Sequence, residues 1–217
     1  MQTRKPMVAG QFYPDERETC LAEIRACLPA EVPHEGVPEP LVGGLVPHAG
    51  WTFSGPLAAL VFATIKRRRR SVGTFVICGA AHGYFGAQPV VDGCAAWETP
   101  LGTIALDEPL REALHDCGAA IVDSSAHRHE HSLEVQVPFL QYLFPGARLL
   151  PIIVPSNHTA LRLGRVIAQI VPTCSAPVIC LGSTDLTHYG PRYGFTPMGI
   201  GAEALGWASR VNDRQFI

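Results

Sequence analysis

The sequence predicts an α/β protein, a three-layer α/β/α sandwich with a mostly parallel central sheet. Short apolar runs of strand length alternate with longer segments that carry a helical apolar stripe. The strand-like runs are continuously apolar, which is typical of strands covered on both faces by helices. A chain of 217 residues, 47% of them apolar, is long enough for one such core. We therefore expect residues 1–217 to form a single domain.

Four apolar runs are the expected strands, and amphipathic segments separate them. The first helix is expected to begin at Asp15, because Asp15 and Glu18 have the spacing of a capping box. Residues 90–106 are typical of less buried, hairpin-like strands, and Asp107 is expected to start a short helix with Pro109 in its first turn. Residues 132–144 contain β-branched residues and a proline, but their apolar spacing favours a helix. The expected strands are 41–47, 74–80, 148–155 and 177–182, and further helices are expected at 56–66 and 159–171.

The composition excludes several functional classes. A net charge of −2 gives no electrostatic reason to expect nucleic acid or an anionic membrane as a partner. The apolar runs fall well short of the ~18 residues needed to span a bilayer, and the N-terminus lacks the apolar core of a signal peptide. Seven cysteines without a C-x-x-C pair indicate free thiols in a reducing compartment. We therefore expect a soluble, cytoplasmic protein.

Three of the expected strands run directly into histidine-containing segments. His48 follows the first strand, His82 follows the second, and Asp185 and His188 follow the last. Ligands of open α/β sheets bind beyond the carboxyl ends of the strands, so we expect these side chains to converge there. Neutral imidazole is the commonest metal ligand in proteins, and a site of this kind suits Fe or Zn with room for a substrate.

The stretch "AHRHEHSLE" is the densest histidine cluster in the chain. His127 and His129 alternate with Arg128 and are expected to face solvent. His131 and Glu134 are three residues apart and would share one helix face, turned toward the site. They could support a metal-bound histidine from outside or act as acid–base groups. Equally, Glu130 and Glu134 could simply suit the positive end of a helix dipole.

Several motifs together resemble one known family. The stretches "AGQFYP", "LVPHAGWTFSGP", "HGYF", "EHSLEVQVPFLQ" and "GSTDLTHYG" occur in this order. They resemble the MEMO-like family, whose bacterial members are called AmmeMemoRadiSam system protein B. The resemblance extends from Met7 to about Leu205.

The resemblance implies a fold similar to that of the class III extradiol ring-cleaving dioxygenases, which hold non-haem Fe(II). By motif, His48 and His82 match the two histidine ligands, and His188 matches the histidine that acts as acid–base in those dioxygenases. It also implies a third ligand, a cysteine nearer the C-terminus, but no cysteine follows Cys180. We therefore expect a chain that lacks a C-terminal segment, and a metal site that is substoichiometric or empty.

Three functions follow from these residues. The first is a metal-binding protein with Fe(II), or with Cu or Zn, that acts as a redox or dioxygenase-like enzyme on a small molecule. The second is a non-enzymatic adaptor that binds a peptide or a small anionic ligand in the same cleft. The absence of arginine from the three histidine segments counts against phosphate binding there. The third is a hydrolase built on Ser183, Asp185 and His188, which lacks a G-x-S-x-G elbow.

Overall fold

The chain has the predicted α/β architecture, and the computed structural model describes residues 2–32, 36–69 and 71–216. Two compact units are present, residues 1–184 and residues 185–217. In the first unit the helices are α1 (Arg17–Cys27), α2 (Trp51–Arg68), α3 (Glu108–Asp116), α4 (Ser124–His127), α5 (Val137–Leu143) and α6 (His158–Ile170), with 3₁₀ turns η1 (Glu134–Gln136) and η2 (Val171–Thr173). Its strands are β1 (Thr3–Arg4), β2 (Gly43–Val46), β3 (Thr74–Gly79), β4 (Val90–Val91), β5 (Ala96–Thr99), β6 (Gly102–Ala105), β7 (Ile121–Val122), β8 (Arg148–Ile153) and β9 (Val178–Ser183).

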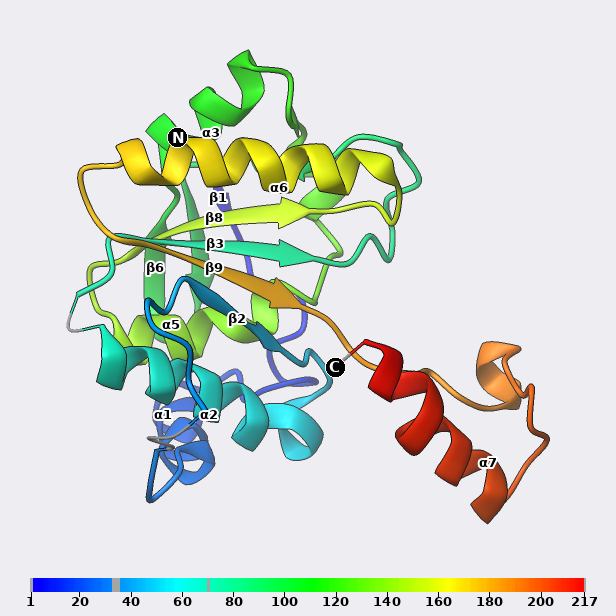
Figure 1. Cartoon of the computed structure of the whole chain (residues 1–217). Coiled ribbons are helices and arrows are strands. Elements are labelled where there is room, and N and C mark those ends of the chain that lie inside the picture. Colours follow the sequence, from blue (N-terminus) through cyan, green and yellow to red (C-terminus); the bar gives the residue numbers. More distant parts are fainter. Residues whose placement is uncertain (1, 33–35, 70, 217) are drawn as a thin grey trace. The chain divides into compact units, whose positions relative to one another are not determined.

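The main sheet of the first unit is mostly parallel. Among the described residues it has six strands in the order β2-β9-β3-β8-β4-β7, and only the β8–β4 pairing is antiparallel. The last strand in the chain, β9, therefore lies between β2 and β3 (Figure 1). A smaller sheet has the order β1-β5-β6, and the antiparallel β5–β6 pair is the hairpin predicted for residues 90–106.

Helices cover both faces of the main sheet, which makes the three layers. Phe75 and Ile77 of β3 pack in one core, and Val76 between them packs in another. This alternation is the period of two that a strand imposes on its side chains. The first core includes residues of α1, α2 and α5, whereas the second includes residues of α3 and α6 (Figure 1).

Two predicted helix starts have different outcomes. Asp107 is the N-cap of α3, where its side chain accepts a hydrogen bond from the Leu110 amide at 3.1 Å. The prediction for Asp15 is wrong by one residue, because Glu16 is the N-cap of α1 and makes no side-chain cap. The second helix begins at Trp51, earlier than predicted, with Pro56 inside it. A proline in the second turn removes only one backbone hydrogen bond, which the remaining turns tolerate.

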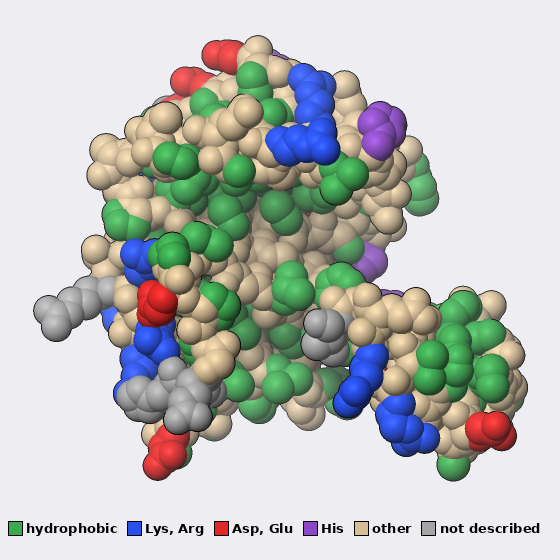
Figure 2. All heavy atoms as spheres, viewed as in Figure 1, with side chains coloured by type: hydrophobic (Ala, Val, Ile, Leu, Met, Phe, Trp, Pro, Cys, Tyr) green, Lys and Arg blue, Asp and Glu red, His purple; other side chains and the backbone are tan. Residues whose placement is uncertain are grey.

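The seven cysteines are all free thiols, as predicted. Cys78 and Cys180 lie on the neighbouring strands β3 and β9, and burial raises the pKa of the Cys78 thiol to about 12. Both border an apolar groove of about 800 Å³ that is also lined by residues of α6. The face of the molecule that Figure 2 shows mixes apolar, acidic and basic side chains. Among the described residues, no helix has both the length and the apolar character needed to cross a bilayer.

The second unit is built from short helical segments. They are a 3₁₀ turn η3 (Pro191–Tyr193), α7 (Ala202–Trp207), a π-helical turn η4 (Ala208–Asn212) and a 3₁₀ turn η5 (Asp213–Gln215). Asp213 accepts hydrogen bonds from the amide and the hydroxyl of Thr187, which ties the end of this unit to its beginning. The segments α7, η4 and η5 follow one another directly, so this helical run contains π and 3₁₀ turns.

Candidate metal centre

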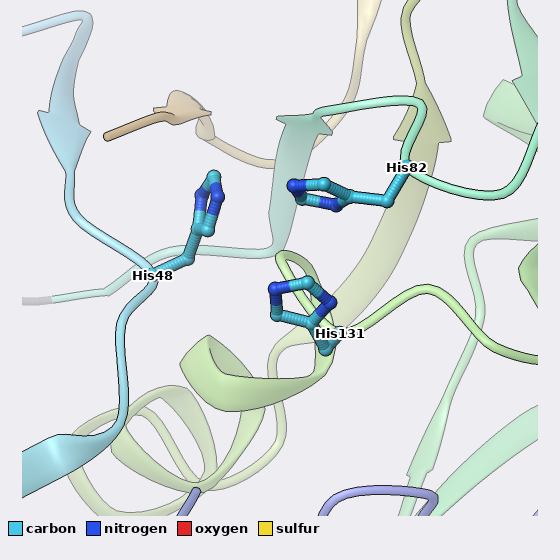
Figure 3. Close-up of side chains that lie close together, drawn as sticks. All are labelled: His48, His82 and His131. Carbon is cyan, nitrogen blue, oxygen red and sulfur yellow. The ribbon is translucent and has the colours of Figure 1, made fainter. Parts of the chain in front are cut away.

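Three histidine side chains lie together beyond the carboxyl ends of β2 and β3. His48 follows β2, His82 follows β3, and His131 precedes η1. One ring nitrogen of each lies within 4.8 Å of those of the other two. The three rings turn toward one another (Figure 3). Among the described residues, no other group of three or more His, Cys, Asp or Glu side chains meets this criterion.

The rings form an arrangement that is closed by protein on one side. His82 and His131 stack with their centroids 4.4 Å apart at 25°, and His48 presents its edge to both, at 5.3 and 5.6 Å. His48 is only 3% exposed, whereas His131 is half-buried and His82 is exposed. The group thus has a buried back and a more accessible front, which is the geometry that a ligand-binding metal site needs.

The hydroxyl of Ser183, at the end of β9, contacts His48. Ser183 Oγ lies 3.3 Å from His48 Nδ1 and donates its one proton to the Ser132 carbonyl oxygen at 2.6 Å. A hydroxyl has a single hydrogen, so towards His48 this oxygen acts as an acceptor. The arrangement favours the His48 tautomer with its proton on Nδ1 and its lone pair on Nε2.

The carboxylate of Glu130 is the partner of His82. Glu130 Oε1 lies 2.9 Å from His82 Nδ1 and accepts the Ser132 amide at 2.8 Å, and Oε2 accepts the His82 amide at 3.1 Å. Burial alone would raise the pKa of Glu130, but the hydrogen bonds from His82 and Ser132 outweigh it and lower the pKa. The sequence suggested only a helix-dipole role for Glu130, and its contact with His82 was not predicted, although its place one residue before His131 was a signal that could have found it.

The N-terminal segment encloses the back of the site through Glu134. This carboxylate is 1% exposed and is bound by Arg4 Nη1 at 2.7 Å and by the Tyr13 hydroxyl at 2.9 Å, as well as by the amides of Met7 and Val8. Burial, and then the Glu134 charge, raise the pKa of Tyr13. Four donor groups converge on one carboxylate, so its surroundings indicate an anchor for the N-terminal segment and not the acid–base group that we considered.

The prediction for the histidine-rich stretch is partly wrong. His129 is exposed, as expected, but His127 is fully buried. His127 Nε2 lies 3.0 Å from the Val90 carbonyl oxygen, and burial lowers the pKa of this imidazole. The sequence could not show this because both partners are distant in sequence: Val90 for the His127 ring, and Arg4, which donates to the His127 carbonyl at 2.9 Å.

His131 lies among the three histidines, where we expected it to support the site from outside. Its ring also packs at 4.9 Å from that of Phe12. His129 is exposed and His131 turns toward the site, as predicted (Figure 3). His131, for which we expected only a supporting role, therefore offers a third nitrogen ligand.

The other two candidate residues belong to the second unit. His188 Nε2 and Asp185 Oδ2 lie 3.3 Å apart, and the His188 ring stacks on Tyr193 at 4.9 Å. The convergence of His188 and Asp185 with His48 and His82 stays a prediction.

Gly79, the last residue of β3, allows the histidine-bearing segments to approach. A Cβ atom there would lie 2.5 Å from Ser132 Oγ and 2.7 Å from Leu133 Cδ2. We expect Gly79→Ala to lower the free energy of unfolding by about 1–3 kcal/mol, because an overpacked core must shift. Gly83→Ala is the control, because its Cβ would have nothing within 4 Å. Equal urea midpoints for the two variants would contradict this close packing.

Comparison with known proteins places this chain in a family. The chain matches the family described as Memo-like protein over residues 4–217. It is 39% identical over 193 residues to a MEMO1 family protein of Methanococcoides burtonii, which covers 87% of this chain and 69% of that protein. It is 37% identical over 220 residues to a MEMO1 family protein of Thermococcus onnurineus, with 98% and 74% covered. The chain therefore belongs to the Memo-like family.

Proposed function

We propose that this chain binds one transition-metal ion through His48, His82 and His131. The observation that carries the proposal is the approach of three imidazole nitrogens to within 4.8 Å of one another. Two nitrogens bound to one ion at ~2.1 Å are at most about 4.2 Å apart, so small side-chain rotations bring all three onto one ion. Imidazole suits Fe, Cu and Zn, and we propose Fe(II) as the resident ion, with Cu or Zn as alternatives.

The proposed activity is that of a redox or dioxygenase-like oxidoreductase acting on a small molecule. Three protein ligands leave further positions on the ion for a substrate, and the bound metal would supply Lewis-acid or redox chemistry there. The buried His48 lies at the back of the site, and the exposed His82 and the half-buried His131 lie at its accessible front. His188, with its partner Asp185, is the proposed proton-transfer group by its match to the dioxygenase histidine.

Metal titration of the protein tests this proposal. We expect the native chain to bind one Fe(II), measured anaerobically by calorimetry, and Zn(II) in a parallel titration. Each of His48→Ala, His82→Ala and His131→Ala should weaken binding by at least about 10–100-fold, because losing a direct ligand costs at least as much as losing one that supports it. His129→Ala is the matched control, since this exposed histidine lies in the same stretch as His131.

The outcomes separate the alternatives. A native chain that binds none of Fe, Cu or Zn overturns the proposal and favours the adaptor function. Unchanged binding by His131→Ala would show that His131 is not a ligand and that the site has a different third group. Loss of binding in His129→Ala would show that the site has been misplaced.

A further inference from the structure

We propose that Glu130 is a positioning residue of the metal centre, which fixes the tautomer of His82 and joins the two segments that carry His82 and His131. The inference rests on the proposed function, because it concerns how the ligands of that ion are held. It assigns a role to a buried carboxylate that is not itself one of the three proposed metal ligands.

The hydrogen bond to His82 determines which nitrogen can bind a metal. Glu130 is 2% exposed, and both of its oxygens accept backbone amides, so the group is held as an acceptor. A carboxylate has no proton to offer, and the 2.9 Å contact therefore requires the proton of neutral His82 to lie on Nδ1. The lone pair of His82 is then on Nε2, which is the atom that would bind the ion.

The same carboxylate fixes two loops against each other. It accepts the amide of His82, in the segment after β3, and the amide of Ser132, next to His131. Ser132 adds a second link, because its hydroxyl oxygen accepts the Ala80 amide at 3.1 Å. The stacking of the His82 and His131 rings at 4.4 Å follows from these links (Figure 3).

Glu130 also places a negative charge beside a site whose ligands are neutral. Three imidazoles bring no charge to offset that of a divalent cation, whereas two-histidine-one-carboxylate sites include an anionic ligand. Glu130 supplies this negative charge through its hydrogen bond to His82. The same hydrogen bond makes the His82 imidazole a stronger electron-pair donor to a metal ion. His48 has the neutral Ser183 hydroxyl in the corresponding position, at 3.3 Å, so the two ligands differ in the charge behind them.

The test has two readouts, and the first needs only the native chain. In metal-free protein with ¹⁵N-labelled histidine, we expect His82 to show a protonated Nδ1 and an unprotonated Nε2. A native His82 with its proton on Nε2 overturns the proposal, whatever happens to any variant. The assignment of the His82 signals comes from comparison with His82→Ala.

The second readout is metal affinity in Glu130→Gln. The amide offers one acceptor oxygen where three donors converge, so we expect a mixture of His82 tautomers and about 10–100-fold weaker Zn(II) binding. The control is Glu108→Gln, which removes a largely exposed carboxylate in α3. Thermal unfolding of both variants confirms that the proteins compared are folded.

The failures of the two proposals are distinguishable. A native chain that binds no metal overturns the proposed function and this role with it. A native chain that binds metal with the same affinity as Glu130→Gln overturns the role of Glu130 alone. Equal loss of affinity in Glu108→Gln would also overturn it, because the effect would then come from net charge and not from the contact with His82.

Discussion

Replacing Glu134 with glutamine is expected to lower the free energy of unfolding by about 3–5 kcal/mol. The substitution keeps the shape of the side chain but removes its charge, and the Arg4 guanidinium, 2.7 Å away and buried, then has no charged partner there. A buried charge without its partner costs far more than the pair itself contributes. Urea unfolding followed by circular dichroism measures the loss.

A surface ion pair provides the matched control for this prediction. Lys5 and Glu98 lie 2.5 Å apart, next in sequence to Arg4, but the lysine side chain is largely exposed. Glu98→Gln should change the free energy of unfolding by at most about 1 kcal/mol, because exposed ion pairs contribute little. If both variants lost the same free energy, burial would not be the reason for the strength of the Arg4–Glu134 pair.

Replacing Phe139 with alanine is expected to lower the free energy of unfolding by about 3–5 kcal/mol. Phe139 of α5 is 0% exposed, and its ring packs at 4.3 Å from Trp51 and 6.0 Å from Phe62, both on α2. Truncation leaves a cavity between two helices that rigid aromatic neighbours fill poorly.

Phe53 of α2 is the control for the core truncation. Its side chain is 82% exposed, so Phe53→Ala should change the free energy of unfolding by no more than about 0.5 kcal/mol. The denaturant midpoints of the two variants are compared where both have the same slope of unfolding free energy against denaturant concentration. A Phe139→Ala protein as stable as Phe53→Ala would mean that α5 does not pack on α2 as described.

The fold could be predicted because its signals are local. Strands β3, β8 and β9 are continuous apolar runs, and the N-cap at Asp107 is set by residues within one helical turn. The ends of these strands also led to His48 and His82, because the rule for parallel sheets needs no contact information. Asp15 failed as a cap because the alternative start at Glu16 differs by a single residue.

The rest of the site depends on contacts that are distant in sequence. The ring of His127 contacts the carbonyl of Val90, 37 residues earlier, and its own carbonyl accepts from Arg4, 123 residues away. Glu134 has a plausible local explanation in the helix dipole, but its hydrogen bonds come from the N-terminal segment. The contact of Glu130 with His82 was not predicted for the same reason, since His82 lies 48 residues earlier. No pattern within one stretch records such pairings.

The position of β9 in the sheet has a consequence for how the protein is made. His48 and His82 follow β2 and β3, which leave the ribosome early, but these strands are not joined in one sheet until β9 pairs with both. Strand β9 is complete about 100 residues after β3, which at ~5–20 residues per second is a delay of roughly 5–20 s. A nascent chain that pauses in this interval therefore has both histidines but not the strand that sets their spacing. The proposed metal site therefore cannot assemble until the last strand of the sheet has been made.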